Sequence, residues 1–185
     1  MTQPLTPDPQ LVARLRAGDR AAFETLFRSY FRRLASYALG LVGTPDAAED
    51  VVQEVFARVW LARDRLSLPD NIGAYLYRAV RNRSLNQLRR VKMLRPLDSV
   101  LEQERADGTT ADPPERAALQ REMQQLVDAA VRALPPRTRE VFVLSRTHGL
   151  TYPEIAAAMG ISIKTVETLM GRALKALRER LRIHR

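Results

Sequence analysis

The sequence predicts an all-α protein made of two small helical domains that a flexible linker joins. Apolar residues recur at helical spacing through most of the chain up to about residue 95, and again after about residue 116. Between them lies the acidic stretch DSVLEQERADGTTADPPER, which loses that spacing and contains glycine and prolines, as flexible tethers do. We therefore expect one helical domain over residues 9–95, a linker over 96–115 and a second helical domain over 116–183.

Four helices are expected in the first domain, because each apolar stripe begins near a residue that favours a helix start. A loop is expected over 63–71, where the periodicity fails and Pro69 occurs. The expected helices are one from Pro9 to Gly18, one from Asp19 to about Gly43, one that Thr44 and Pro45 begin, and one that Asn71 begins and that reaches about Met93.

The second domain should end in three helices with two short breaks between them. Thr151 and Glu154 have the spacing of a capping box, which starts a helix. Gly160 should end that helix, since glycine adopts positive φ without strain. Ser162 should cap a longer helix with a basic outer face. Helix, tight turn and basic second helix are the layout of a helix-turn-helix whose recognition helix enters the DNA major groove.

The composition of the chain and the motifs it lacks limit the classes of function that we expect. The chain has 185 residues and a formal net charge of +9, which favours a polyanionic partner, although a composition biased toward arginine would give the same charge. It has no cysteine, which excludes zinc fingers, disulfides and thiol catalysis. His148 and His184 lack metal-ligand spacing, and no phosphate loop, G-x-S-x-G or triad occurs. We therefore expect no metal, no cofactor and no enzyme activity.

No stretch at the N-terminus has the pattern of a signal peptide, and no apolar run is long enough to cross a bilayer. The expected location is the cytoplasm, without membrane insertion.

Two blocks of the sequence resemble the extracytoplasmic-function (ECF) subfamily of bacterial sigma factors. FETLFRSYFRRLASYAL, AEDVVQEVFARVW and AYLYRAVRNRSLNQLRR are similar to sigma region two, and LPPRTREVFVL with GLTYPEIAAAMGISIKTVETLMGRALKALR is similar to sigma region four. The resemblance implies a sigma factor that binds core RNA polymerase and promoter DNA, directs transcription initiation, and is held inactive by an anti-sigma factor. It further implies that region four recognises duplex −35 DNA and that region two melts −10 DNA.

The resemblance assigns three groups of residues. For the polymerase it implies polar contacts from one helix face, at Asp50, Gln53 and Glu54. The alternative is a solvated face whose acids favour the helix dipole. For melted −10 DNA it implies a face on which asparagine amides suit a base edge and arginines suit phosphates, at Arg78, Asn82, Asn86 and Arg89. The alternative there is an ordinary exposed polar face. The loop over 66–73 would supply a wall for an extruded base.

For −35 DNA the expected contacts lie outside the apolar seam of the recognition helix, at Ser162, Lys164, Thr165, Glu167, Thr168, Arg172 and Lys175. The alternative for Arg172, Lys175 and Arg178 is a solvated amphipathic face. Lys164 and Glu167 depart from the family pattern, which has glycine and a basic residue there. The acidic linker is expected to be a tether, or to mimic nucleic acid near the polymerase cleft.

Two other classes of protein compete with this interpretation. A LuxR-like regulator would share the helix-turn-helix but would lack AEDVVQEVFARVW and the long Asn/Arg helix. A nucleic-acid enzyme would need a metal or catalytic cluster, which the sequence does not show.

Overall fold

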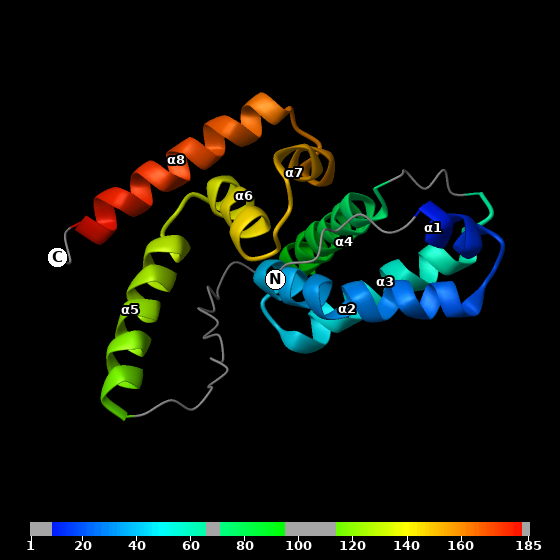
Figure 1. Ribbon diagram of the computed structural model, residues 1–185, viewed down its shortest axis with the longest axis horizontal. Coiled ribbons are helices and arrows are strands. Elements are labelled where there is room, and N and C mark those ends of the chain that lie inside the picture. Colours follow the sequence, from blue (N-terminus) through cyan, green and yellow to red (C-terminus); the bar gives the residue numbers. More distant parts are fainter. Residues whose placement is uncertain (1–8, 66–70, 95–113, 183–185) are drawn as a thin grey trace.

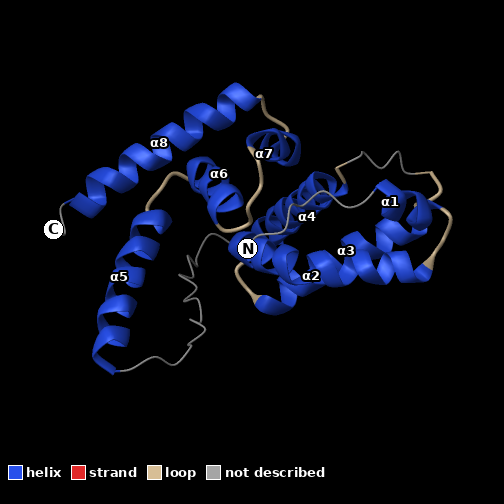
Figure 2. Ribbon diagram, viewed as in Figure 1, coloured by secondary structure: helices blue, strands red, loops and turns tan. Residues whose placement is uncertain are grey.

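The computed structural model describes the backbone of residues 9–65, 71–94 and 114–182, and within these ranges every regular element is a helix (Figures 1 and 2). This confirms the all-α fold. Most of the predicted linker lies outside the described residues, and the helix after it begins at Pro114. The helices are α1 Pro9–Arg16, α2 Arg20–Val42, α3 Pro45–Leu61, α4 Ile72–Leu94, α5 Pro114–Arg132, α6 Pro136–Arg146, α7 Tyr152–Met159 and α8 Ile163–Arg182.

The helices of the first unit, α1–α4, begin and end where the sequence places them. Asp19 Oδ1 accepts hydrogen bonds from the N–H groups of Ala21 (2.8 Å) and Ala22 (3.3 Å), which caps α2. Gly43 ends α2 with φ of 92°, a left-handed conformation that glycine adopts at low cost. Asn71 caps α4, since its Oδ1 accepts from the Ala74 N–H at 3.0 Å. These local signals therefore fix the lengths of the helices that pack together.

The core of the first unit lies between α2, α3 and α4. Leu26 and Leu34 of α2, Val52 and Phe56 of α3, and Leu76 of α4 are at most 1% exposed. Within α2 and within α3 they lie eight and four positions apart, so each of these helices turns one apolar stripe inward. The opposite face of α3 remains available for partners, whereas α4 also packs against α7 of the second unit.

The second unit contains the predicted helix-turn-helix. The Glu154 carboxylate accepts hydrogen bonds from the Thr151 N–H (2.7 Å) and Oγ1 (2.8 Å), and Gly160 ends α7 with φ of 64°. Ser162 Oγ then accepts from the Thr165 N–H at 3.1 Å and caps α8. Helix α5 and the turn after it pack on α8 through a small cluster of Ala130, Leu134, Ala173 and Leu177, and Figure 1 shows α5 extending away from α8.

Among the described helices, none combines the length and the apolar composition that a membrane span requires.

Candidate functional site

Helix α8 has one buried seam and one exposed polar face. Val166, Met170 and Ala173 are at most 2% exposed and pack against the rest of the unit. The residues of the opposite face are all exposed, and none forms an ion pair with another described residue. They are Lys164, Glu167, Thr168, Arg172 and Lys175. These side chains are therefore available to a partner along most of the helix.

Two of the predicted DNA contacts at the start of α8 have a structural role. Ser162 Oγ accepts from the Thr165 N–H, and the two hydroxyls are 2.8 Å apart. Both side chains are exposed, but their hydrogen bonds hold the first turn of α8. Lys164 and Glu167 extend from the same turns, and their side chains make no such bond to other described residues.

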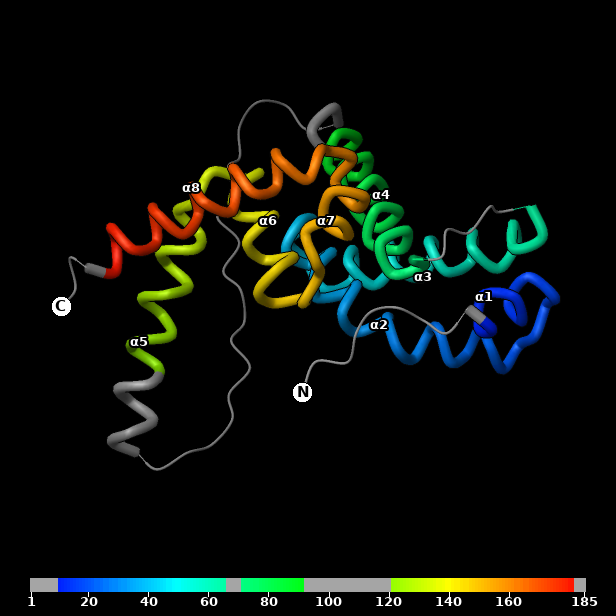
Figure 3. The backbone as a smooth tube through the Cα atoms, turned by 45° about the horizontal axis from the view of Figure 1, so that its top comes forward, coloured from blue at the N-terminus to red at the C-terminus, as the bar shows by residue number. Residues whose placement is uncertain are grey.

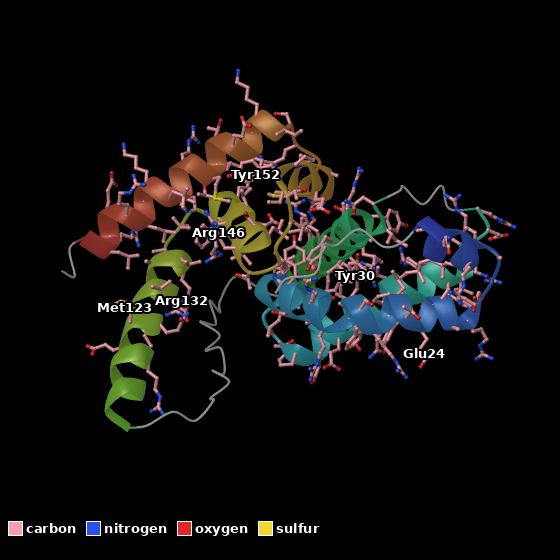
Figure 4. The ribbon with its side chains drawn as sticks, viewed as in Figure 1. Glu24, Tyr30, Met123, Arg132, Arg146 and Tyr152 are labelled. Carbon is pink, nitrogen blue, oxygen red and sulfur yellow. The ribbon has the colours of Figure 1, made fainter. Side chains whose placement is uncertain are left out.

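The outer face of α3 carries the acidic and polar residues that the sequence singled out. Asp50 and Gln53 are exposed, together with Glu49 one turn before Gln53. Gln53 also lines a groove of about 650 Å³ whose walls are aromatic. Phe23 and Trp60 meet there with ring centroids 5.0 Å apart, and Glu24 lies nearby on the outer side of α2, away from α6 and α7 (Figure 4). This side of the first unit therefore joins a polar face to an apolar groove.

Glu54 differs from its neighbours on α3, because it faces α4. Its carboxylate pairs with Arg58 Nη2 at 2.6 Å and with Arg83 Nη2 of α4 at 2.5 Å. The Glu54 side chain is 32% exposed. The sequence placed Glu54 with Asp50 and Gln53 on one face, and the structure adds partners on α4 that the helical spacing of α3 does not reveal.

A second pocket, of about 230 Å³, lies between α3 and α4. Asn82 and Asn86 line it, together with Tyr75, and both asparagines are exposed. Arg78 and Arg89 are exposed on α4 outside the pocket. Its lining is completed by Glu54, Val55, Arg58, Val59, Ala79 and Arg83. The structure therefore brings the two predicted asparagines together with α3 residues that the sequence analysis did not assign to DNA.

The two units also contact each other, through α4 and α7 and through a largely buried ion pair. Glu140 of α6 accepts from Arg81 of α4 (Nε 2.7 Å, Nη2 3.2 Å) and from the Tyr37 hydroxyl of α2 (2.7 Å). Asn71 Nδ2 donates to Glu154 Oε1 of α7 at 2.8 Å. Figures 1 and 3 show α6 and α7 beside α4.

His148 lies within this contact and is 3% exposed. Its ring meets the rings of Tyr37 and Tyr77 edge-on, at centroid distances of 5.6 and 5.5 Å. Arg33 Nη2 donates to its backbone carbonyl at 3.2 Å. Burial, together with the positive charge of Arg33, lowers the pKa of His148 to about 4. The imidazole is therefore neutral at pH 7, and it packs against the two tyrosine rings of the first unit as an uncharged side chain.

An all-α chain with an exposed basic recognition helix and a second helical unit that carries a polar pocket defines a DNA-binding protein of the helix-turn-helix class. Among the described residues, no group of His, Cys, Asp and Glu side chains is placed to hold a metal ion. Comparison with known families shows which kind of DNA-binding protein the chain resembles. Residues 26–93 match Sigma-70 region 2, and residues 124–177 match Sigma-70 region 4.

Three relatives are similar in sequence to this chain along nearly its whole length. The ECF RNA polymerase sigma-E factor of Escherichia coli K12 is 32% identical over 183 residues, which cover 96% of this chain and 95% of that protein. The RNA polymerase sigma-H factor of Pseudomonas aeruginosa is 30% identical over 177 residues, covering 92% and 91%. The ECF sigma factor SigW of Bacillus subtilis is 27% identical over 180 residues, covering 92% and 95%.

Solved structures of similar fold include two complexes. CnrH, in complex with the cytosolic domain of CnrY, has a TM-score of 0.66 and 27% identity, covering 94% of this chain and 96% of that one. The sigma factor RpoE of Bartonella quintana, in complex with the anti-sigma factor NepR, has a TM-score of 0.67 and 25% identity, covering 88% and 98%. The chain belongs to the ECF family of RNA polymerase sigma factors. It is a sigma factor that directs promoter-specific transcription initiation with core RNA polymerase.

Proposed function

We propose that the two units divide the work of initiation, with α8 on duplex −35 DNA and the first unit on polymerase and melted −10 DNA. The observation that carries this proposal is the outer face of α8, which is exposed, basic and free of ion pairs to other described residues. Lys164 and Glu167 would meet base edges, because the first turns of a recognition helix enter the groove. Arg172 and Lys175 would hold phosphates further along.

The polymerase would dock on the outer face of α3, at Asp50 and Gln53. Both side chains are exposed on a helix whose other side is buried in the core, so the helix that carries them is held in place. Acidic groups suit a protein partner better than DNA, which would repel them. The aromatic groove beside Gln53 adds apolar area to the same surface. Glu54 has partners within the chain and is a weaker candidate for this contact.

Melted −10 DNA would bind along α4, at Arg78, Asn82, Asn86 and Arg89. The two asparagine amides line a pocket and have no hydrogen bond to any other described residue, so they are available to a base. Arg78 and Arg89 are exposed on either side of them along the helix and would hold the backbone.

An anti-sigma factor is a further proposed partner. Two sigma-factor-like structures of similar fold were solved with a second protein, and one of these proteins is described as an anti-sigma factor. We further propose that the chain acts in the cytoplasm, where the polymerase is, and that it supplies no catalytic group, because the polymerase forms the phosphodiester bonds.

The test is run-off transcription with core polymerase, the purified chain and a library of genomic fragments. A specific transcript that depends on the chain is the expected result, and its absence from every fragment would contradict the function.

The docking surface is tested with Asp50→Arg and Gln53→Arg, which should weaken binding to core polymerase while the circular dichroism spectrum stays unchanged. The matched control is Glu122→Arg, a charge reversal at an exposed position of α5 outside the proposed surfaces. Full polymerase affinity in a folded Asp50→Arg, Gln53→Arg double variant would remove the docking assignment.

A further inference from the structure

The hydroxyl groups in the first turns of α8 already make hydrogen bonds within the helix. Ser162 Oγ and Thr165 Oγ1 lie 2.8 Å apart. Thr168 Oγ1 donates to the Lys164 carbonyl oxygen at 2.9 Å. The charged groups of Lys164 and Glu167 are exposed, and neither forms an ion pair with another described residue. These two side chains therefore keep their full hydrogen-bonding capacity for a partner.

Lys164 and Glu167 carry opposite charges and lie three positions apart, so they are neighbours on one face of α8. Together they add no net charge to this face. Non-specific affinity for DNA comes from the neutralisation of phosphates by cations, to which a pair without net charge adds little. Arg172 and Lys175, further along the helix, are the proposed phosphate contacts. The first two side chains are therefore suited to discrimination between base pairs.

The Glu167 carboxylate matches one base of the major groove best. An ionised carboxylate only accepts hydrogen bonds, and the amino donors in that groove are cytosine N4 and adenine N6. Adenine also presents the acceptor N7, which repels a carboxylate, whereas cytosine presents no acceptor there. Guanine, which pairs with cytosine, presents the acceptors O6 and N7, and these suit the Lys164 ammonium. The two side chains together are thus complementary to cytosine and guanine.

Gly171 lies beside these side chains, four positions after Glu167 on the exposed face. Its φ is not positive, and a Cβ built on it would meet no atom within 4 Å beyond its chain neighbours and the backbone of its own helix turns. Neither backbone conformation nor packing therefore requires glycine here, although glycine destabilises a helix interior relative to alanine. A position without a side chain lets a partner approach the backbone closely. Close approach would bring base edges within reach of the Glu167 carboxylate.

We propose that Glu167 is a specificity-determining residue that selects a cytosine in the −35 element by accepting a hydrogen bond from its N4 amino group. Lys164 donates to the guanine of the same or the adjacent base pair, and Gly171 is the point of closest approach. Three positions span about 4.5 Å along a helix, and one base step spans about 3.4 Å, so the two side chains reach neighbouring bases. The proposal rests on the proposed −35 function of α8 and names the base that this face selects.

The experiment is selection by holoenzyme from promoter duplexes with a randomised −35 element. The wild type should favour cytosine at one position by about 5- to 140-fold, which corresponds to about 1–3 kcal/mol per base contact. Glu167→Gln should change the selected base at that position to adenine, because glutamine pairs with adenine N6 and N7. Glu179→Gln is the matched control, since it removes the same charge from an exposed position near the end of α8. It should still select cytosine.

Two further measurements separate a base contact from a structural role. A duplex with pyrimidin-2-one in place of the selected cytosine lacks the N4 amino group. The wild type should bind this duplex more weakly than the cytosine duplex, and Glu167→Ala should bind the two with similar affinity. Gly171→Gln should raise the melting temperature of the chain, because glutamine favours helices more than glycine does, and it should weaken duplex binding several-fold.

The same selected base in Glu167→Gln and in the wild type would overturn the proposal, as would a wild type that selects no cytosine in the element. Wild-type duplex affinity in a folded Gly171→Gln variant would overturn the close approach. Failure of the proposed −35 function is seen separately, before any variant is made, as a chain-dependent transcript with no base selected at any −35 position.

Discussion

Replacing Glu140 by alanine should separate the two helical units without unfolding either one. The Glu140 carboxylate joins α6 to Arg81 of α4 and to Tyr37 of α2. The side chains of Arg81 and Glu140 are 15% and 11% exposed, so little water would replace the lost bonds. Burial raises the pKa of Tyr37, and the charge of Glu140 raises it further, so the hydroxyl keeps the proton that it donates.

The magnitude follows from what the variant leaves behind. Removing one partner of a buried ion pair costs about 3–5 kcal/mol, because the remaining charge stays buried and unpaired. Since about 1.4 kcal/mol is tenfold in an equilibrium constant, the ratio of docked to separated chains should fall by at least about a hundredfold. Val141 and Leu144 of α6 are fully buried in a hydrophobic cluster that includes Ile155 of α7 and Val166 of α8, so the second unit should keep apolar contacts of its own.

Fluorescence energy transfer between the units measures the effect directly. The chain has no cysteine, so Ser36→Cys on α2 and Arg178→Cys on α8 give two unique labelling positions, both exposed. Glu140→Ala should lower the transfer efficiency while the helical circular dichroism signal is retained. The control is Glu24→Ala, which breaks an exposed pair with Arg28 that is worth about 1 kcal/mol or less. Unchanged transfer in Glu140→Ala would show that the ion pair does not hold the units together.

Three other predictions concern pH, −35 DNA and −10 DNA. Because burial lowers the pKa of His148 to about 4 in the folded chain, against 6.5 in the unfolded one, the unfolded state alone gains a proton as the pH falls through that interval. The free energy of unfolding should therefore not depend on His148 well above the pKa of the unfolded state, and it should drop by about 2 kcal/mol between pH 7.5 and 5. Urea denaturation measures this drop, and His148→Gln should remove it. Arg172→Ala should weaken the binding of duplex DNA across all sequences. Lys164→Ala should instead alter the preference for −35 sequences, by about 1–3 kcal/mol per lost base contact. Selection from a randomised duplex measures this preference, and an unchanged preference in Lys164→Ala would refute the base contact. The Asn82→Ala, Asn86→Ala double variant should impair promoter opening more than it impairs formation of the closed complex. Permanganate footprinting of melted DNA measures the opening. Normal reactivity at −10 in the double variant would show that this face of α4 is only solvated surface.

The sequence predicted most helix ends, because their signals are local. Asp19 caps α2, and Thr151 with Glu154 forms the capping box of α7. Gly43 and Gly160 end helices with positive φ. In each case the groups that form the bond lie within four residues of each other, so spacing alone identifies them. Thr44 is a partial exception, since it stands at the N-cap of α3 but its side chain makes no capping bond.

The contact between the units was not predicted, because its partners are far apart in the chain. Arg81 and Glu140 are separated by 59 positions, and Asn71 and Glu154 by 83. Asn71 and Glu154 each have a local interpretation, as helix caps, that is correct but incomplete. Glu154 closes a capping box with one oxygen and bonds to Asn71 with the other. Glu54 likewise fits the acidic face of α3 by spacing, and only the tertiary structure shows Arg83 beside it.

The docked arrangement places the two proposed DNA-binding faces too close together for simultaneous use. Asn82 lies about 17 Å along α4 from Asn71, and Ser162 lies at most about 20 Å along the chain from Glu154. Since Asn71 bonds to Glu154, Asn82 and Ser162 are less than about 50 Å apart.

Elements centred near −10 and −35 are about 85 Å apart on straight B-form DNA, at about 3.4 Å per base pair. Extended chain between Leu94 and Pro114 reaches about 60 Å, enough to bridge units that have moved apart. With the proposed DNA-binding faces, binding both promoter elements would require the Arg81–Glu140 and Asn71–Glu154 contacts to break, and the free energy for this would come from contacts with polymerase and DNA. The interface thus opposes promoter binding by the free chain.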